Sequence, residues 1–358
     1  MHVMEIIKLR PIPAAGLFLS LTRRCPLKCA HCSTNSLMTS EQYAGEIFLR
    51  FVETFTPANH PQVLMLTGGE ALLRPRLVQR LIELAHAAGT RVSLTSGMFF
   101  ARQQQIPPSI ERAIAGLDHF TASLDIFHEQ QVPRAAVFRV LKALVERGQD
   151  VSIQVVGMDE NDPYLADVTA DIRRTFNDRV PAYVAPVNAV GRAREWLEER
   201  EHYAPLDIAP QPCGLATWPV MTYDGTIIAC CNQEVVDGPV PPHLRLGHSL
   251  EDDWTTISGR LLQSNLLRAI RVFGPEYIAN RHSAGKVDCD GYCSTCYRLA
   301  DDPAISERLA PLMARQTMRF VERQLVTIQQ QRSSFGIQAY QYMLGLGYDP
   351  ERRELCVN

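Results

Sequence analysis

Short β-rich runs alternate with stretches of helical periodicity from residue 17 to about residue 187. The expected strands are 17–22, 62–67, 91–96, 118–124, 151–157 and 182–187. Apolar residues recur at helical spacing in 41–57, 75–89, 108–116, 134–148 and 163–176. Strands that are separated by helices form a parallel sheet with right-handed crossovers. Because a full barrel takes eight strands, these six predict an α/β fold whose sheet does not close.

Three cysteines follow the first expected strand, at Cys25, Cys29 and Cys32, with the spacing C-x3-C-x2-C. A loop with three thiolates can hold a [4Fe–4S] cluster, which normally takes four cysteines. Three ligands leave one iron open, and an open metal position is where a substrate or cofactor binds. A zinc site and a chance grouping of cysteines are the alternatives.

This triplet, at the end of the first barrel strand, resembles the signature of the radical S-adenosylmethionine (SAM) enzymes. The resemblance implies a (β/α)6 partial TIM barrel with its chemistry at the C-terminal ends of the strands. It also implies that a reduced cluster gives one electron to SAM, and that the resulting 5′-deoxyadenosyl radical abstracts a hydrogen from a substrate. The protein's part is then binding, orientation and exclusion of water. A flavodoxin- or ferredoxin-like protein is the implied electron donor.

The second expected strand ends in Gly68-Gly69-Glu70. Two glycines let the backbone approach a ligand closely, and a carboxylate beside them can accept hydrogen bonds from an ammonium group. The run matches the Gly-Gly-Glu motif with which the family binds the amino group of SAM. The family often has proline at the next position, where this chain has Ala71.

The third and fourth expected strands also end in polar residues. Ser96 stands where the family often has asparagine, and alternation places Ser123 and Asp125 on one face of a strand. The resemblance implies that these residues hydrogen-bond the ribose and carboxylate of SAM. A simple cap at a strand end is the alternative reading.

Two further contacts with SAM are implied only by the resemblance. Pro186 lies in the sixth-strand segment that borders the adenine, next to the run Gly191-Arg192-Ala193. His31 stands before the third cysteine, where the family packs a side chain on the adenine. We expect His119 and His128 to be either substrate contacts or supporting residues.

A second group of cysteines lies between residues 213 and 296. It resembles the auxiliary-cluster region of the family, which is called SPASM when it holds two clusters and twitch when it holds one. We expect one auxiliary [4Fe–4S] cluster, for which Cys289 competes with the four favoured ligands and Cys231 points away. The four favoured ligands are Cys213, Cys230, Cys293 and Cys296. A structural zinc site is the alternative, since four thiolates also suit that metal.

Prolines at 205, 210 and 212 mark a boundary in the chain. We expect an N-terminal extension, a radical SAM core, an auxiliary-cluster domain and a C-terminal helical segment, at 1–16, 17–205, 206–300 and 301–358. Apolar residues at helical spacing, Phe320 and Ile328 among them, predict a helix over 303–331 that packs against the barrel, and Pro311 either kinks this helix or marks its start.

The formal charge of −3 gives no general attraction to nucleic acid or to an anionic membrane. No apolar run reaches the length of a membrane span and no signal-peptide layout is present, so we expect a cytoplasmic protein. Ten cysteines in that compartment favour metal chemistry over disulfides.

The substrate expected from the resemblance is a peptide that is post-translationally modified, or a natural-product intermediate. Radical dehydrogenation of a small molecule (an aminocyclitol, sugar or nucleotide) is the alternative. About 16 residues precede the first strand, too few for a folded leader-peptide domain. A non-catalytic metal-binding protein is a remote alternative, because it does not explain Gly68-Gly69-Glu70 at the end of a strand.

Overall fold

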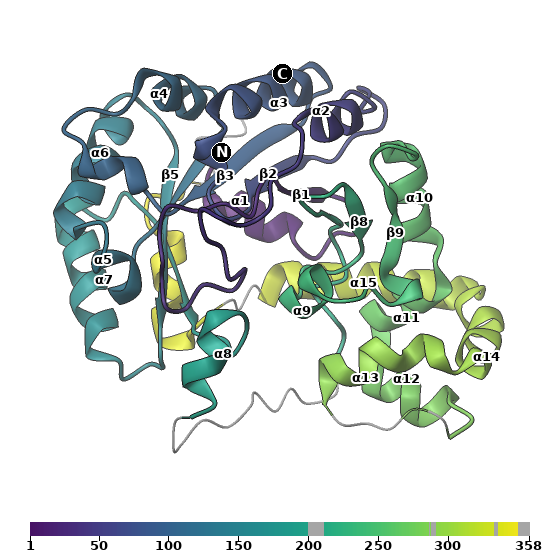
Figure 1. The fold of residues 1–358 in the computed structure, drawn as a ribbon. Coiled ribbons are helices and arrows are strands. Elements are labelled where there is room, and N and C mark those ends of the chain that lie inside the picture. The colour runs from purple at the N-terminus through teal and green to yellow at the C-terminus, as the bar shows by residue number, and fades with distance from the viewer. Residues whose placement is uncertain (200–210, 286, 288–290, 333–335, 350–358) are drawn as a thin grey trace.

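The structure is a computed structural model that describes residues 1–199, 211–285, 287, 291–332 and 336–349 (Figure 1). Of the ten cysteines, Cys289 and Cys356 lie outside these residues, and so do Pro205 and Pro210.

In the described part of the chain, nine strands form one sheet, in the order β6-β5-β4-β3-β2-β1-β7-β8-β9. The first six are parallel neighbours, as expected. Their bounds are β1 Gly16–Ser20, β2 Val63–Thr67, β3 Arg91–Ser96, β4 His119–Ser123, β5 Val151–Gly157 and β6 Ala182–Pro186. The predicted α/β partial-barrel fold is therefore confirmed.

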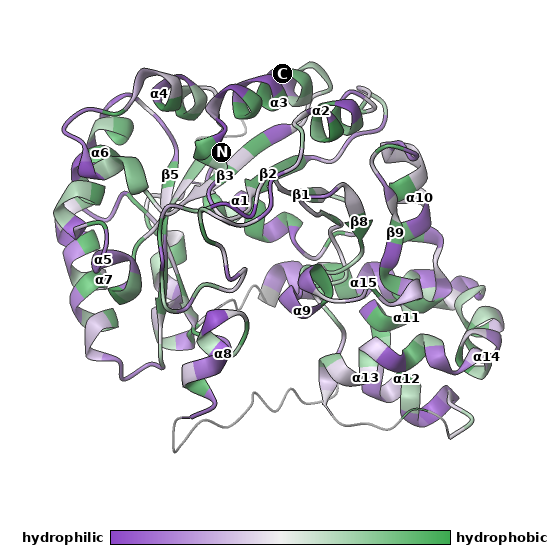
Figure 2. Cartoon of the chain, viewed as in Figure 1, coloured by the Kyte–Doolittle hydropathy of each residue, from purple (hydrophilic) through white to green (hydrophobic). Residues whose placement is uncertain are grey.

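Helices connect these strands at the predicted places, and the short helices α5 and α8 follow β4 and β6. The bounds are α1 Val3–Leu9, α2 Glu46–Val52, α3 Pro75–Ala87, α4 Pro108–Ala115, α5 Ile126–Glu129, α6 Arg134–Glu146, α7 Pro163–Phe176 and α8 Arg192–Leu197. Local sequence explains their starts: α7 begins at Pro163, directly after Asp162, whose side chain accepts a hydrogen bond from the Tyr164 N–H. Figure 2 shows apolar and polar residues alternating along the outer helices, as expected when one face covers a core.

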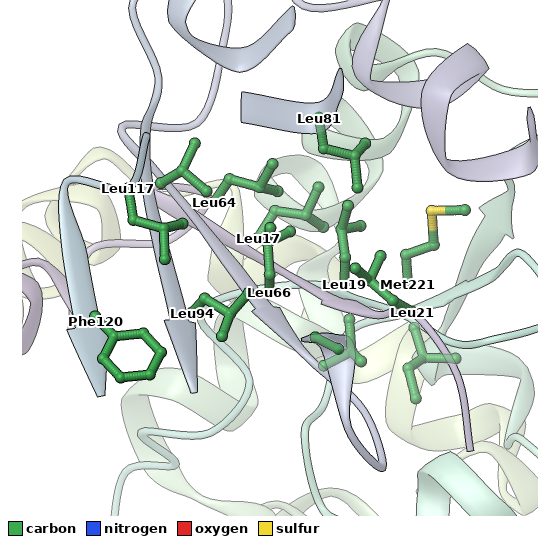
Figure 3. Close-up of a cluster of buried hydrophobic side chains, with 14 of the residues drawn as sticks. Leu17, Leu19, Leu21, Leu64, Leu66, Leu81, Leu94, Leu117, Phe120 and Met221 are labelled. Carbon is green, nitrogen blue, oxygen red and sulfur yellow. The ribbon is translucent and has the colours of Figure 1, made fainter. Parts of the chain in front are cut away.

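Alternation along the strands separates the core from the interior of the barrel. Leu17 and Leu19 of β1 are fully buried and belong to the cluster of leucines between the sheet and the helices (Figure 3). Phe18 and Ser20 of the same strand face the other way, into a central cavity. The same strand therefore anchors the core and lines the cavity.

The chain after residue 211 extends the sheet beyond β1. Strand β7 (Val220–Met221) runs parallel to β1, with Phe18 opposite Val220. Strands β8 (Thr226–Ile228) and β9 (Arg245–His248) follow in antiparallel pairing. Helices then gather on one side of the sheet (Figure 1): α9 Gln233–Asp237, α10 Trp254–Gln263, α11 Asn265–Phe273, α12 Pro275–His282, α13 Tyr292–Arg298, α14 Pro303–Met313 and α15 Gln316–Arg332.

The helix expected over 303–331 is divided into two helices, and the division follows shortly after Pro311, where we expected a kink or a start. Helix α14 ends at Met313 and α15 begins at Gln316, after the proline at 311 inside α14. The side chains of Phe320 and Ile328 are 57% and 40% exposed, so they do not pack against the barrel. A further short 3-10 helix, η5, covers Gln338–Gly345.

Within the described residues, none of the helices combines the length and the apolar character needed to cross a membrane.

Candidate active site

A cavity of about 530 Å³ opens at the C-terminal ends of the parallel strands. Each of the six strands contributes to its wall, and so do the cysteine loop and α9. One lining residue from each strand, in chain order, is Ser20, Thr67, Thr95, Ser123, Gln154 and Ala185. Pro186 lines it too, as expected for a residue beside a bound cofactor.

The three cysteines of the first loop all line this cavity. Each sulfur has a hydrogen-bond partner: Cys25 Sγ accepts from the Leu27 N–H at 3.4 Å, and Cys32 Sγ lies 3.4 Å from Thr34 Oγ1. Cys29 Sγ accepts from Gln131 Nε2 at 3.6 Å. The structure thus brings together the three thiols that the sequence places in one loop.

The environments of these thiols differ. Burial raises the pKa of Cys25 to about 12. Burial acts in the same sense on Cys32, but the hydrogen bond with Thr34 and the nearby Arg192 guanidinium outweigh it and lower the pKa of that thiol. Iron binding requires thiolates, so Cys32 is the thiol of the two that gives up its proton more readily.

The residues that follow β2 hold the start of the cysteine loop through backbone hydrogen bonds. The Gly69 N–H donates to the Thr22 carbonyl at 2.6 Å, and the Glu70 N–H donates to the Arg24 carbonyl at 2.9 Å. A Cβ atom on Gly69 would lie 2.5 Å from the Arg24 carbonyl oxygen. Gly68, at φ +141°, adopts a conformation that favours glycine, and its Cβ would meet the Thr22 carbonyl at 2.5 Å. The two glycines are therefore required by the close approach of the loop.

The Glu70 carboxylate is not part of the cavity lining. It is 1% exposed and accepts hydrogen bonds from the Ser96 hydroxyl and the N–H groups of Leu72 and Gly97, at 2.9 to 3.1 Å. Burial outweighs these bonds and raises the pKa of Glu70 to about 7. Glu70 and Ser96 thus join the ends of β2 and β3, while Gly68 and Gly69 form the cavity wall.

The Asp125 carboxylate is also engaged within the chain. Its Oδ1 accepts from the N–H groups of Phe127 and His128 at 3.0 Å and caps α5. Its Oδ2 lies 2.8 Å from His128 Nδ1 and 3.4 Å from His31 Nε2. His31 and His128 both line the cavity, and the His31 ring centroid lies 4.6 Å from that of Phe127. Asp125 therefore ties the cysteine loop to the end of β4.

Helix α8 packs against the cysteine loop and donates hydrogen bonds to it. The Arg192 N–H donates to the Cys32 carbonyl at 3.0 Å, and Trp196 Nε1 donates to the Ala30 carbonyl at 2.9 Å. Gly191, at φ +55°, precedes the helix, and a Cβ there would lie 2.3 Å from the Cys32 carbonyl oxygen. The sequence indicated the Gly191 segment, but nothing in it indicated the contacts of Trp196 and Gln131.

The favoured cysteines of the second group are neighbours in the structure. The Cys230 thiol interacts electrostatically with Cys213 and Cys296, and Cys293 interacts with Cys213. Hydrogen-bond donors face the sulfurs: the Asn232 N–H donates to Cys230 Sγ at 3.3 Å, and Asn232 Nδ2 donates to Cys293 Sγ at 3.4 Å. Cys296 Sγ lies 4.0 Å from His243 Nε2.

The spacing of the sulfurs distinguishes two kinds of metal centre. Tetrahedral zinc with Zn–S bonds of about 2.3 Å needs sulfurs roughly 3.8 Å apart. Among the described cysteines, no three sulfur atoms lie within 4.8 Å of one another. A cubane places its four irons at separate corners and takes more widely spaced thiolates. The described sulfurs are thus not arranged as the ligands of a bound zinc ion would be.

Cys231 lines the central cavity, and its thiol also interacts electrostatically with Cys213 and Cys230. Its Sγ accepts a hydrogen bond from Arg10 Nη2 at 3.3 Å. The Arg10 guanidinium lies over the rings of Phe18 and Trp218, at 5.0 and 4.9 Å from their centroids. Cys231 therefore adjoins both the central cavity and the second cysteine group.

The family model described as the Radical SAM superfamily matches residues 19–172, which contain the end of β1, the three-cysteine loop and strands β2 to β5. Over these residues the chain is similar to the radical SAM superfamily of enzymes. Its motif residues are those that line or support the central cavity.

Curated relatives match part of the chain. GTP 3′,8-cyclase of Picosynechococcus sp. is 34% identical over 120 residues, which are 32% of this chain and 35% of that protein. PqqA peptide cyclase of Methylocella silvestris is 28% identical over 190 residues, which are 52% of this chain and 48% of that protein. The chain thus spans about a third to a half of the length of these relatives.

Solved structures share the fold. SuiB of Streptococcus suis, crystallised with the precursor peptide SuiA, superimposes with a TM-score of 0.52 at 14% identity. The match covers 76% of this chain and 70% of SuiB. The likeness extends beyond the radical SAM model match and includes much of the C-terminal region.

Proposed function

We propose that this protein cleaves SAM reductively and uses the resulting 5′-deoxyadenosyl radical to abstract a hydrogen from a substrate. The observation that carries the proposal is that the thiols of Cys25, Cys29 and Cys32 face the same cavity as the ends of all six parallel strands. When bound at these thiols, a [4Fe–4S] cluster supplies the electron for that cleavage.

The residues around the cavity have two roles in this proposal. Gly68 and Gly69, Ser123 and Pro186 form the wall against which SAM binds, and His31 packs beside the adenine. Glu70, Ser96 and Asp125 mainly support the residues of that wall, because their polar atoms already bind other groups of the chain.

We further propose that Cys213, Cys230, Cys293 and Cys296 hold an auxiliary [4Fe–4S] cluster within an auxiliary-cluster domain at 206–300, between the core at 17–205 and the segment at 301–358. The interactions among these thiols and the donors around their sulfurs support this ligand set. Cys289 remains a candidate ligand outside the described residues. Such a cluster can take the electron that a substrate radical loses in a net oxidation.

For the substrate we propose a peptide that is modified after translation. PqqA peptide cyclase and SuiB, which was crystallised with a precursor peptide, support this choice. The similarity to GTP 3′,8-cyclase favours a small molecule such as a nucleotide as the second candidate. A flavodoxin- or ferredoxin-like protein is the proposed electron donor in either case.

The decisive experiment is anaerobic reconstitution with iron and sulfide, followed by dithionite and SAM. We expect the wild-type chain to release 5′-deoxyadenosine, detected by mass spectrometry, and C29A to release none. A wild-type chain that holds its cluster and forms no 5′-deoxyadenosine contradicts the proposal.

The auxiliary cluster has a separate test. The triple variant C25A/C29A/C32A should still bind about four irons, because its second cysteine group is intact. Binding of zinc in place of iron under the same conditions contradicts the auxiliary cluster and leaves the radical reaction standing.

A further inference from the structure

The side chain of Gln131 makes two hydrogen bonds to the cysteine loop. Its Oε1 accepts from the Lys28 N–H at 2.8 Å, and its Nε2 donates to Cys29 Sγ at 3.6 Å. An amide has one acceptor and one donor end, so the bond to the Lys28 N–H fixes which end faces the sulfur. The donor end of Gln131 is therefore directed at a proposed cluster ligand.

Gln131 is held in place by the turn that follows α5. The N–H groups of Gln131 and Val132 both donate to the His128 carbonyl, at 2.9 and 2.8 Å, and the Val132 side chain is fully buried. Asp125 caps the start of the same turn. The amide is thus positioned by a rigid segment rather than by the loop that it contacts.

The three thiols of the loop differ in the origin of these donors. Leu27 and Thr34, which face Cys25 and Cys32, belong to the loop itself. Gln131 is separated from Cys29 by 102 positions in the chain. His128 of the same segment also interacts with the Cys29 thiol. Cys29 is therefore the sulfur whose surroundings α5 and the turn that follows it can alter without changing the loop.

Hydrogen bonds to the sulfurs are one of the factors that set the reduction potential of an iron–sulfur cluster. A donor stabilises the more negative, reduced state more than the oxidised state, and so raises the potential. We propose that Gln131 is a positioning residue that raises the reduction potential of the cluster at Cys25, Cys29 and Cys32. This inference rests on the proposed function, because it requires a cluster at these three thiols.

The test is a redox titration of the reconstituted full-length chain, followed by the electron paramagnetic resonance signal of the reduced cluster. Addition of SAM identifies the relevant signal, because only a cluster with an open iron changes its spectrum when SAM binds. We expect a more negative midpoint in Q131L, which removes the donor, than in the wild type. Q131E, which also brings a negative charge to the sulfur, should lower the midpoint further.

The matched control is Q130L, because Gln130 is exposed and adjacent. Its midpoint should equal that of the wild type. Equal midpoints in Q131L and the wild type overturn the inference while the proposed function stands. Loss of iron from both Q131L and Q131E, with normal iron in Q130L, also overturns it and assigns Gln131 to the folding of the loop. A wild-type chain without any SAM-sensitive signal contradicts the proposed function itself.

Discussion

His128 Nδ1 lies 2.8 Å from Asp125 Oδ2 in a turn where both side chains are almost fully buried. Burial disfavours the charged imidazole, but the Asp125 carboxylate outweighs it and raises the pKa of His128 to about 10. The pair is therefore charged at neutral pH, and His31 of the cysteine loop approaches the same carboxylate oxygen.

The first prediction concerns this pair. D125N removes the negative charge and leaves His128 buried without its counter-ion, so the free energy of unfolding should fall by about 3 kcal/mol. Urea denaturation of the metal-free chain, followed by circular dichroism, measures the change. D253N, at the exposed cap of α10, should change it by less than about 0.5 kcal/mol because asparagine caps a helix equally well. Equal losses of unfolding free energy in D125N and D253N would show that the buried pair stabilises the fold no more than an exposed helix cap does.

The second prediction concerns the backbone contact between β2 and the cysteine loop. In G69A the new Cβ must displace the Arg24 and Arg23 carbonyls, which lie 2.5 and 2.7 Å from it. We expect the iron content after reconstitution to fall by the share of one cluster. G259A places its Cβ in ordinary contact inside α10 and should keep full iron content. Normal iron content in G69A would mean that the loop can shift without losing its ligands.

The third prediction is a pH dependence. The pKa of Glu70 is raised to about 7, so its contribution to folding is complete below pH 4.5 and is lost as the pH rises through about 7. The free energy of unfolding of the wild type, minus that of E70Q, should fall by at most about 3 kcal/mol over this window. E146Q, at an exposed position of α6, should follow the wild type. A constant difference between E70Q and the wild type from pH 4 to pH 8 contradicts the assignment.

The fourth prediction separates two adjacent cysteines. C231S should retain the iron of the auxiliary site, because the Cys231 thiol faces Arg10 and the central cavity. C230S should lose most of that iron, since its sulfur faces the other members of the second group. Iron analysis in the C25A/C29A/C32A background isolates the auxiliary site. Equal iron loss in the two variants would place Cys231 among the ligands.

Local patterns in the sequence were enough to predict the strands and helices of the barrel. The run at 151–157 was predicted to the residue because β-branched residues fill it, and the helix at 163–176 because Asp162 and Pro163 mark its start. Strand β7 has only two residues, too few for any periodicity, and it exists because β1 offers an unpaired edge. The break before Gln316 likewise has no clear signal in the apolar pattern.

The residues of the candidate site also fall into two groups, those that local sequence predicts and those that it does not. The three cysteines and the two glycines could be predicted because each motif lies within a short stretch of the sequence. The direction of the Glu70 carboxylate could not be predicted, since it depends on where Ser96 and Gly97 of the next strand lie. The contact between Gln131 and Cys29 joins positions that only the folded barrel brings together.

Strand β1 has a consequence for how electrons and substrates can be exchanged in this protein. The C-terminal end of β1 leads into the first cysteine loop. One edge of β1 pairs with β2 and the other with β7, and the β7–β8 hairpin then leads to Cys230. Both cysteine groups thus adjoin strands of one hydrogen-bonded sheet. Under the proposed function, this shared pairing helps to set the distance between the two clusters, while loops around the cavity can change to admit a different substrate.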